Sequence, residues 1–327
     1  MDNNLDTESD AILITGPTAS GKSALAVELA RRHGGVVVNA DSMQVYDTLR
    51  LLTARPDEAD MGGIEHCLYG HVSAASAYST GAWAREAQAL VAQLKGEGRL
   101  PVFVGGTGLY FKALTGGLSD MPEIPAAIRE RLRERLKAEG AEALHRDLEA
   151  RDPETAVTLK PGDGQRIVRA LEVVEATGKP IRFFQQQTGP MIVDPDRATK
   201  YVVLPERKLL HDRINRRFQL MLAGGAIDEA RALLALELPS EMPIMKAIGV
   251  SQIAALLKGE LDEAEVIEMG AAATRQYAKR QMTWFRNQLD DSWQRISSAV
   301  AADQSARFSC QDTPKRSVTQ LKRWLKP

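Results

Sequence analysis

The sequence predicts an α/β fold: a P-loop core whose parallel sheet is flanked by helices, with a helical insertion domain carried on that core. Three observations support this prediction. Short apolar runs alternate with helical patterns, as they do in parallel sheets. A glycine-rich loop joins the first apolar run to the first helical pattern. Further along, the strand pattern is missing from Asp120 to Lys179 and then returns.

Four apolar runs are predicted as strands, at 11–15, 36–39, 101–106 and 201–205. The helical pattern SALAVELARRH follows the glycine loop, and a second helix is expected at 83–94. Between the third and fourth strands lie the helical segments RERLRERLKAEGAEALHRDLEA and QRIVRALEVVEATGKP. After the fourth strand the chain is mostly helical to about residue 288, with breaks at 223–225 and 258–260.

These elements set the expected domain limits. A helical block bracketed by strands of one sheet is best explained as an insertion into the sheet domain. We therefore expect the P-loop catalytic core at 11–119 and 197–298 and the helical insertion domain at 120–196. An acidic N-terminal tail is expected at 1–10 and a C-terminal tail at 299–327.

The composition excludes several classes of protein. The fractions of 44% hydrophobic and 26% charged residues are close to those of ordinary globular chains, which argues against a disordered or fibrous protein. The two cysteines, the acidic N-terminus without a secretory signal and the lack of any apolar run of about 18 residues favour a cytoplasmic protein with no membrane partner. The net charge of −1 identifies no partner.

Two segments are nevertheless locally basic. Residues 197–217 hold seven Lys or Arg residues against two acids, and residues 275–286 hold four against none. In the second segment a basic face is predicted at helical spacing, made by Arg275, Lys279, Met282 and Arg286. A polyanion could bind there, but a solvated helix face is the simpler alternative for each segment.

The glycine loop matches the phosphate-binding pattern G-x-x-x-x-G-K-[ST] at every fixed position. Its residues are Gly16, Pro17, Thr18, Ala19, Ser20, Gly21, Lys22 and Ser23. In such a loop the backbone N–H groups surround an anion at a helix N-terminus, the lysine adds a positive charge and the serine hydroxyl can bind Mg²⁺. The pattern predicts a polyphosphate site, against the alternative of a glycine turn that binds nothing.

Two further strand ends carry candidate site residues. A nucleotide hydrolase or kinase would usually hold magnesium with an Asp at the end of an apolar strand, but the run at 101–104 is followed by glycines and Thr107. Asp41 instead follows the strand at 36–39. Because open α/β sheets bind ligands at the carboxyl ends of their strands, we expect Asp41 and the loop 105–110 beside the phosphate site. The alternatives are a helix cap for Asp41 and a structural turn for the loop.

Seven sequence blocks together resemble the tRNA dimethylallyltransferases, also called tRNA isopentenyltransferases or IPP transferases. They occur in the family's order and span nearly the whole chain up to about Asn287. The blocks are GPTASGKS at 16–23, DSMQVY at 41–46, TARP at 53–56, VGGTGLYFKAL at 104–114, QRIVRALEVVEATGKP at 165–180, RINRRF at 213–218 and RQYAKRQMTWFR at 275–286. The resemblance implies a P-loop core and a helical domain that closes over a tRNA anticodon stem-loop.

The resemblance also implies a reaction, the transfer of a dimethylallyl group from dimethylallyl diphosphate to the exocyclic N6 of adenosine at tRNA position 37, next to the anticodon. Residues 16–23 would bind the diphosphate leaving group, with Mg²⁺ on Ser23. Arg217, with Arg213 as the weaker candidate, would stabilise the charge of that leaving group. Asp41 would be the base that accepts the proton of the amine, and Thr107 would orient the amine.

The RNA contacts follow from the same resemblance. The target adenine must be pulled out of its stack, and the residues that would hold it are Asp41, Ser42, Met43, Gln44 and Thr107. The contacts from the insertion domain would be Arg129, Gln165, Arg166, Ile167, Val168 and Arg169. Lys279 and Arg286 gain support as contacts to the RNA backbone, although Trp284 and Phe285 could be core residues. We expect a monomer that binds tRNA and dimethylallyl diphosphate, with Mg²⁺ as cofactor.

Some positions depart from the family pattern. His66-Cys67 stands where two adjacent histidines are common, and Asp47 to Leu52 lacks the usual glycine. The group of His66, Cys67 and His71 does not predict zinc, because no second ligand pair follows at a suitable spacing. Two alternative functions are a P-loop kinase of a small molecule or nucleotide, and a nucleotide-switch module that binds RNA, for which no N-K-x-D motif is found.

Overall fold

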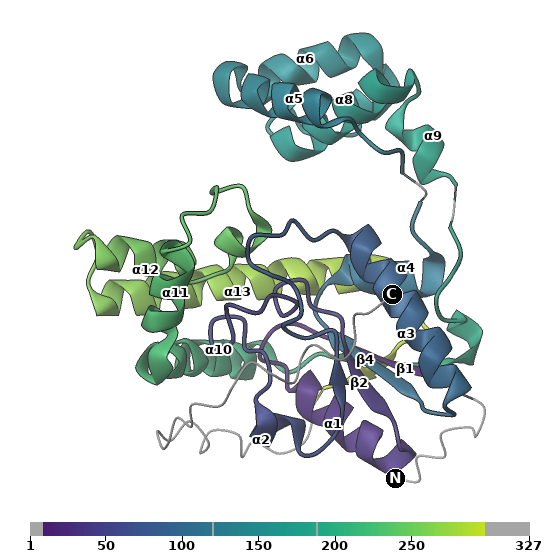
Figure 1. Cartoon of the computed structure of the whole chain (residues 1–327), viewed down its shortest axis with the longest axis vertical. Helices are drawn as coiled ribbons and strands as arrows, with labels where there is room; N and C mark the ends of the chain where they lie inside the picture. The colour runs from purple at the N-terminus through teal and green to yellow at the C-terminus, as the bar shows by residue number, and fades with distance from the viewer. Residues whose placement is uncertain (1–8, 120, 188, 298–327) are drawn as a thin grey trace. The chain divides into compact units, whose positions relative to one another are not determined.

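The computed structural model describes residues 9–119, 121–187 and 189–297 (Figure 1). Within these, the chain divides into two compact units, one made of 12–78, 98–108 and 199–297 and the other of 9–11, 79–97 and 109–198. The predicted N-terminal tail lies outside the described residues except at 9–10, and the predicted C-terminal tail at 299–327 lies outside them altogether.

The first unit is built on a six-stranded sheet, which confirms the predicted fold class (Figure 1). The strand order is β3-β2-β4-β1-β5-β6, and the pairs β1–β4, β2–β4, β2–β3 and β5–β6 are parallel. The strands are β1 (Ala11–Thr15), β2 (Val36–Asn39), β3 (His66–Cys67), β4 (Pro101–Gly105), β5 (Ala198–Val203) and β6 (Gln294–Ile296).

The four predicted strands are confirmed, whereas β3 and β6 were not predicted. They have two and three residues, too short to show an apolar pattern, and β6 is the polar sequence QRI. The unusual pair His66-Cys67 forms β3 and pairs with Val37 and Val38 of β2 at the edge of the sheet. Sheet pairing with a buried neighbour, rather than local sequence, makes these segments strands.

The centre of the sheet is fully buried. Every residue of β1, β2 and β4 is buried, as expected for parallel strands covered on both faces. Helix α1 (Lys22–His33) packs against β2 and β4 and buries Ala26, Leu29 and Ala30. It begins directly after the glycine loop, so the loop is anchored between the buried strand β1 and a packed helix.

Helices follow β5 in this unit, as predicted. They are α10 (Arg207–Met221), the π-helix η2 (Leu222–Ala226), α11 (Ile227–Leu234), the 3-10 helix η3 (Pro243–Lys246), α12 (Val250–Leu257) and α13 (Glu263–Gln288), while the short α2 (Glu58–Met61) precedes β3. The predicted break at 258–260 separates α12 from α13. The predicted break at 223–225 falls in η2, where Gly225 has a left-handed φ of 105° and kinks the helix into α11.

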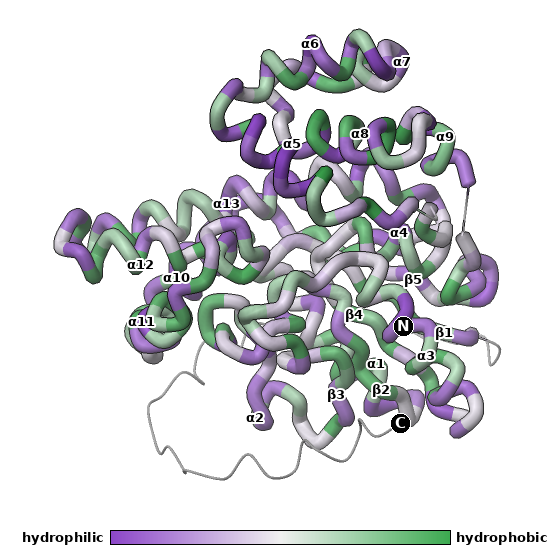
Figure 2. Tube along the Cα trace, turned by 45° about the horizontal axis from the view of Figure 1, so that its top comes forward, coloured by the Kyte–Doolittle hydropathy of each residue, from purple (hydrophilic) through white to green (hydrophobic). Residues whose placement is uncertain are grey.

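The second unit is helical. It holds α3 (Thr80–Gly96), α4 (Gly108–Gly116), α5 (Ala126–Glu139), α6 (Ala141–Arg151), α7 (Pro153–Ala156), α8 (Gly164–Thr177), α9 (Ile181–Gln185) and the 3-10 helix η1 (Pro195–Arg197). Helix α8 packs against α5 and α6, and hydrophobic residues alternate with hydrophilic ones along α6 and α8 (Figure 2). The absence of strands predicted for 120–179 is confirmed for its described residues, while the limits 120–196 stay a prediction.

A small core holds these inserted helices together. It includes Leu132 of α5, Leu144 and Leu148 of α6, and Ile167 and Leu171 of α8, all nearly or fully buried. Burying side chains of this size contributes about 1.5–3 kcal/mol each.

No helix of the described residues combines the length and the apolar character that a membrane span requires.

Close packing of α10 on α13 gives a first prediction. A Cβ atom added at Gly270 of α13 would lie 1.9 Å from Cζ of Phe218 on α10. Gly270→Ala should therefore lower the free energy of unfolding by about 1–3 kcal/mol, because the helices must separate or the ring must move. Urea unfolding followed by circular dichroism measures this change.

Gly96→Ala in α3 is the matched control, because nothing lies within 4 Å of the added atom there. This substitution should leave stability unchanged or raise it by up to about 1 kcal/mol. Equal effects of the two substitutions would contradict the close contact at Gly270.

Candidate active site

The register of three strands brings three loops to one edge of the sheet. Thr15 at the end of β1 pairs with Gly105 of β4, and Asn39 at the end of β2 pairs with Val104. The chain therefore leaves β1, β4 and β2 at nearly the same level. The loops that follow are those predicted to form the site, and the carboxyl ends of parallel strands are the usual place for ligands.

The glycine loop has the geometry of an anion site. Ala19 and Gly21 have left-handed φ values of 63° and 91°, and Gly21 is the N-cap of α1 without a side-chain cap. The first N–H groups of α1 thus point toward the loop without a side-chain partner, which favours an anion. The hydroxyl of Ser20 is buried and has no hydrogen-bond partner in the described part of the chain. An orphaned polar atom inside the loop fits a site whose ligand supplies partners.

Two cations lie beside this loop and act on the same carboxylate. Burial lowers the pKa of Lys22 to about 8, while the carboxylate of Asp41 raises it and Arg217 lowers it. Burial also lowers the pKa of Arg217, while the negative charges of Asp41 and Asp60 raise it. Lys22 Nζ donates to the carbonyl of Pro17 at 3.1 Å. Neither cation forms a salt bridge with any described residue, so both can face an anionic ligand.

Asp41 is held by the backbone turn that it begins. One carboxylate oxygen accepts the N–H of Met43 at 2.9 Å, and the other has no hydrogen bond among the residues described. The N–H of Asp41 donates to Oδ1 of Asn39 at 2.8 Å. Turns rather than a helix follow Asp41, so the alternative of a helix cap is wrong. The second oxygen is thus positioned to accept a proton near Lys22 and Arg217.

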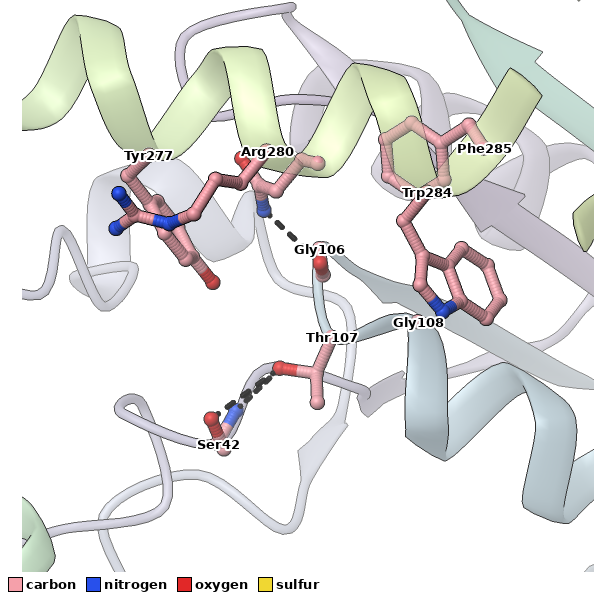
Figure 3. Close-up of a pocket in the computed structure, with 9 residues that line it drawn as sticks. Ser42, Gly106, Thr107, Gly108, Tyr277, Arg280, Trp284 and Phe285 are labelled. Atoms are coloured by element: carbon pink, nitrogen blue, oxygen red, sulfur yellow. Dashed lines mark hydrogen bonds between the residues drawn. The ribbon is translucent and has the colours of Figure 1, made fainter. Parts of the chain in front are cut away.

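Thr107 joins the loop after β4 to the loop after β2. Its hydroxyl accepts the N–H of Ser42 at 2.9 Å and lies 3.3 Å from the hydroxyl of Ser42, to which it donates (Figure 3). Its own N–H donates to the carbonyl of Ala40 at 3.2 Å. Thr107 therefore lies where a ligand that contacts both loops would bind. Its hydroxyl, however, already has hydrogen-bond partners within the protein. The contact of this loop with a ligand therefore stays a prediction, and a structural turn stays its alternative.

A pocket of about 220 Å³ opens in front of these two loops, and helix α13 forms its other wall (Figure 3). Its lining residues are Ser42, Gly106, Thr107, Gly108, Tyr277, Arg280, Gln281, Trp284 and Phe285. A Cβ atom at Gly108 would lie 2.4 Å from the indole of Trp284, so only glycine allows this approach. Burial, and secondarily Asp41, raise the pKa of Tyr277, which keeps its phenol protonated.

Four α13 residues on this wall were not predicted as site residues from the sequence, namely Tyr277, Arg280, Gln281 and Trp284. They lie on the side of the helix opposite the predicted basic face, since the two sets are offset by half a turn. On the basic face, Arg275 hydrogen-bonds Asn215 and Met282 packs with Leu210 and Ile214 of α10. Lys279 and Arg286 are exposed. The spacing of Tyr277, Gln281 and Trp284 was the signal available in the sequence.

The segment 42–55 is held from two sides. The side-chain amide of Gln44 donates to the carbonyls of Thr53 and Ala54, both at 2.9 Å, so its NH₂ group is used within the protein. The carboxylate of Glu229 on α11 accepts N–H groups of Arg50, Leu51 and Leu52 at 2.8–3.3 Å. The stretch that departs from the family pattern is therefore ordered by a carboxylate far away in the sequence.

The residues predicted to contact RNA from the helical unit divide into two groups. Gln165 and Arg166 at the start of α8 are exposed, and Arg129 of α5 is half-buried. Ile167 and Val168 are buried in the core of the inserted helices, so the prediction that they contact RNA is wrong for their side chains. Arg169 is paired at 3.1 Å with Glu172, which is buried.

The metal predictions concern Ser23 and the group at 66–71. Ser23 is exposed in the first turn of α1, where its hydroxyl can act as an oxygen ligand. His66 Nδ1 lies 2.9 Å from the carbonyl of Ile64, and the ring of His71 contacts Tyr78. Across the described ranges there is no group of three or more His, Cys, Asp or Glu residues that could hold a metal ion.

The site brings together two cations that form no ion pair with a described residue and a carboxylate oxygen without a hydrogen bond among those residues. These groups suit a reaction in which an anionic group leaves while an acceptor loses a proton. This fold and this site define a P-loop enzyme that transfers a group. Residues 44–288 match the IPP transferase family, and residues 9–74 match the isopentenyl transferase family. The chain belongs to the IPP transferase family, as its sequence blocks predicted.

Similar proteins agree with this assignment. The tRNA dimethylallyltransferases of Sinorhizobium medicae and Rhizobium meliloti are each 74% identical, over 91% and 92% of this chain and 98% and 99% of their own. A solved tRNA isopentenylpyrophosphate transferase of Bacillus halodurans is 33% identical with a TM-score of 0.63, covering 89% of this chain and 90% of that one. A eukaryotic dimethylallyltransferase acting on tRNA has a TM-score of 0.71 at 27% identity, covering 84% and 69%.

The lowered pKa of Lys22 predicts how anion binding depends on pH. Below about pH 8 the ammonium is charged and attracts the anion; above it the free protein loses this charge. The affinity for inorganic diphosphate should therefore fall as pH rises past about 8, by up to about tenfold per pH unit. Isothermal titration calorimetry in EDTA measures the dissociation constant at each pH.

Lys22→Arg is the matched control, because a guanidinium stays charged throughout this range. The ratio of wild-type to Lys22→Arg dissociation constants removes the titration of diphosphate itself. This ratio should rise with pH, and a ratio that stays constant between about pH 7 and 9.5 would contradict a Lys22 pKa near 8.

Proposed function

We propose that this chain transfers the dimethylallyl group of dimethylallyl diphosphate to N6 of adenosine 37 in tRNA, with release of diphosphate. The observation that carries the proposal is that Asp41, with one unshared carboxylate oxygen, lies close enough to both Lys22 and Arg217 to act on the charge of each. An allylic transfer to an amine needs both features, because the leaving group gains negative charge and the amine loses a proton. Relatives named tRNA dimethylallyltransferase at 74% identity support the choice of substrates.

The leaving group is bound by the glycine loop. As the bond between the allylic carbon and the diphosphate oxygen breaks, charge builds on that oxygen. The N–H groups at the start of α1, Lys22 and Arg217 stabilise this charge in a partly enclosed site. Lys22 donates one N–H to the carbonyl of Pro17 at 3.1 Å, and its ammonium has two further N–H groups for the ligand.

The acceptor amine is a poor nucleophile because its lone pair is delocalised into the adenine ring. As N6 forms its bond to the allylic carbon, the amine proton passes to the unshared oxygen of Asp41. The contacts of Thr107 with Ala40 and Ser42 hold the Asp41 turn next to the pocket that Ser42 and Thr107 line. Asp41 acts here as the general base, and Thr107 keeps the loops around it in place.

Mg²⁺ fits the oxygen ligands that are present. Mg²⁺ is commonly bound by one or two protein oxygens together with substrate phosphates and water. The exposed hydroxyl of Ser23 beside Lys22 would supply the protein oxygen. When bound, Mg²⁺ would neutralise part of the charge on the diphosphate.

The RNA partner in this proposal is the anticodon stem-loop. The target adenine would leave its stack and enter the pocket between Ser42–Thr107 and α13, where Tyr277 and Trp284 offer aromatic rings (Figure 3). The exposed Gln165 and Arg166 would contact the anticodon loop from the helical unit. We place this reaction in the cytoplasm and expect the chain to act as a monomer.

The test is incubation with bulk tRNA and either allyl-labelled dimethylallyl diphosphate or γ-labelled ATP. Label from the allyl group should become RNA-bound, and nucleoside analysis should place it on N6 of adenosine. Transfer of phosphate from ATP to any acceptor, without allyl transfer, would instead establish the kinase alternative.

The role of Asp41 predicts the effect of Asp41→Asn. The amide keeps the size of the side chain and can still accept the N–H of Met43, but it cannot take a proton. Single-turnover rates at saturating substrates should fall by about 100-fold to 10,000-fold. Asp47→Asn, at an exposed carboxylate six positions along the same loop, is the control and should stay near the wild-type rate. A rate for Asp41→Asn within about threefold of wild type would exclude Asp41 as the base.

The exposed cations of α13 predict a change in salt dependence. Each Lys or Arg that neutralises an RNA phosphate contributes about one unit, or somewhat less on single strands, to the slope of log affinity against log salt. Lys279→Ala and Arg286→Ala should each lower that slope and leave diphosphate affinity unchanged. Arg32→Ala at the far end of α1, away from the loop edge of the sheet, should change neither. An unchanged slope in both α13 variants would make this face a solvated surface.

A further inference from the structure

A single buried side chain connects the phosphate loop to the loop of Thr107. Gln281 of α13 is 6% exposed and spans the two loops with both ends of its amide. Its Oε1 accepts the N–H of Thr18 at 3.0 Å, and its Nε2 donates to the carbonyl of Gly106 at 2.9 Å. The second of these bonds is the dashed line that ends at Gly106 in Figure 3. The donor and acceptor on opposite sides leave only one orientation of the amide that satisfies both loops.

The side-chain amide of Gln281 is closely packed against Gly106. A Cβ atom added at Gly106 would lie 2.1 Å from Nε2 of Gln281, so a residue larger than glycine there would displace the amide. The Thr18 N–H that Gln281 uses lies early in the glycine loop, before the N–H groups at the start of α1. Diphosphate at the helix N-terminus and the Gln281 contact are therefore compatible.

Hydrogen bonds continue from this bridge to the general base. Gly106 is followed by Thr107, whose N–H donates to Ala40 and whose hydroxyl accepts the N–H of Ser42. Asp41 lies between these two partners and binds the N–H of Met43. One run of contacts thus joins the loop for the leaving group, through Gln281, to the segment that holds the base for the incoming amine.

We propose that Gln281 is a positioning residue that sets the separation between the diphosphate subsite and the adenine subsite. The proposal rests on the proposed function, since it concerns the alignment of those two substrates. Each substrate has its own binding groups, so each should bind without Gln281. Transfer, however, requires the allylic carbon and N6 to approach in line, and a misplacement of about 1 Å can cost on the order of 100-fold in rate.

The experiment compares Gln281→Met and Gln281→Glu with wild type and with Gln288→Met. Methionine has similar length and cannot form either hydrogen bond, whereas glutamate keeps the acceptor for Thr18 and loses the donor to Gly106. Gln288, two turns further along α13, is exposed and carries the same substitution as a control. Single-turnover transfer gives a rate and an amplitude, and the amplitude reports the fraction of competent molecules. Separate titrations give the affinities for inorganic diphosphate and for tRNA.

Both Gln281 variants should lose about 10-fold to 100-fold in rate at saturating substrates. The tRNA dissociation constants of both variants and the diphosphate dissociation constant of Gln281→Met should stay within about threefold of wild type, while the added carboxylate of Gln281→Glu weakens diphosphate binding by charge repulsion. Gln288→Met should match wild type throughout. A rate within about threefold of wild type in either folded variant would overturn the proposal. The proposal would also be overturned if the loss of transfer came from a smaller fraction of competent molecules, or if it came from weaker binding of one substrate in Gln281→Met. If Gln281→Met does not fold, the single-turnover rate of Gln281→Glu decides whether the proposal stands. Absence of transfer by wild type would refute the proposed function instead, and so the two failures are distinguishable.

Discussion

The pairing of β1, β4 and β2 is the constraint on which the site depends. Because Thr15 is level with Gly105 and Asn39 with Val104, the three following loops emerge together at one edge of a buried sheet. A slip of one residue between these strands would turn every buried side chain to the other face, so the register is strongly determined. The phosphate loop, the Asp41 turn and the Thr107 loop inherit their spacing from it.

The electrostatic field at this edge of the sheet depends on Lys22, Arg217 and Asp41, which form no direct ion pair among the described residues. Elsewhere some charged side chains are paired directly, as in the Arg135 bridges to Glu139 and Asp147, which raise the pKa of that arginine. Lys22 and Arg217, by contrast, share the field of Asp41 without a direct ion pair among the described residues. Burial of unpaired charge costs free energy, which an anionic ligand can offset. This arrangement stabilises the bound state of the protein at the expense of the free one.

Helix α13 serves two structural purposes through different faces. One face packs on α10, where Ala278 and Met282 join Leu210 and Ile214. The other face closes the pocket with Tyr277, Gln281 and Trp284. The packing of the first face holds the second in place. A helix fixed by its own core contacts can therefore act as a rigid wall for the site, which favours accurate placement of ligands.

Much of this architecture was determined by the sequence alone. The apolar runs predicted β1, β2, β4 and β5, the glycine pattern predicted the phosphate loop, and the position of Asp41 after a strand predicted its place near that loop. These signals are local, because they depend on periodicity or on a fixed spacing within a few residues. The order of the blocks along the chain likewise predicted the family.

The tertiary structure decided what distant segments do for one another. No local pattern could show that Gln281 would meet Thr18, some 263 positions away, or that Glu229 would hold the N–H groups at 50–52. It also decided that Ile167 and Val168 face a core while their neighbours Gln165 and Arg166 face solvent. Such roles depend on which helix face is covered and on which buried polar group lacks a partner, and only the packed chain determines both.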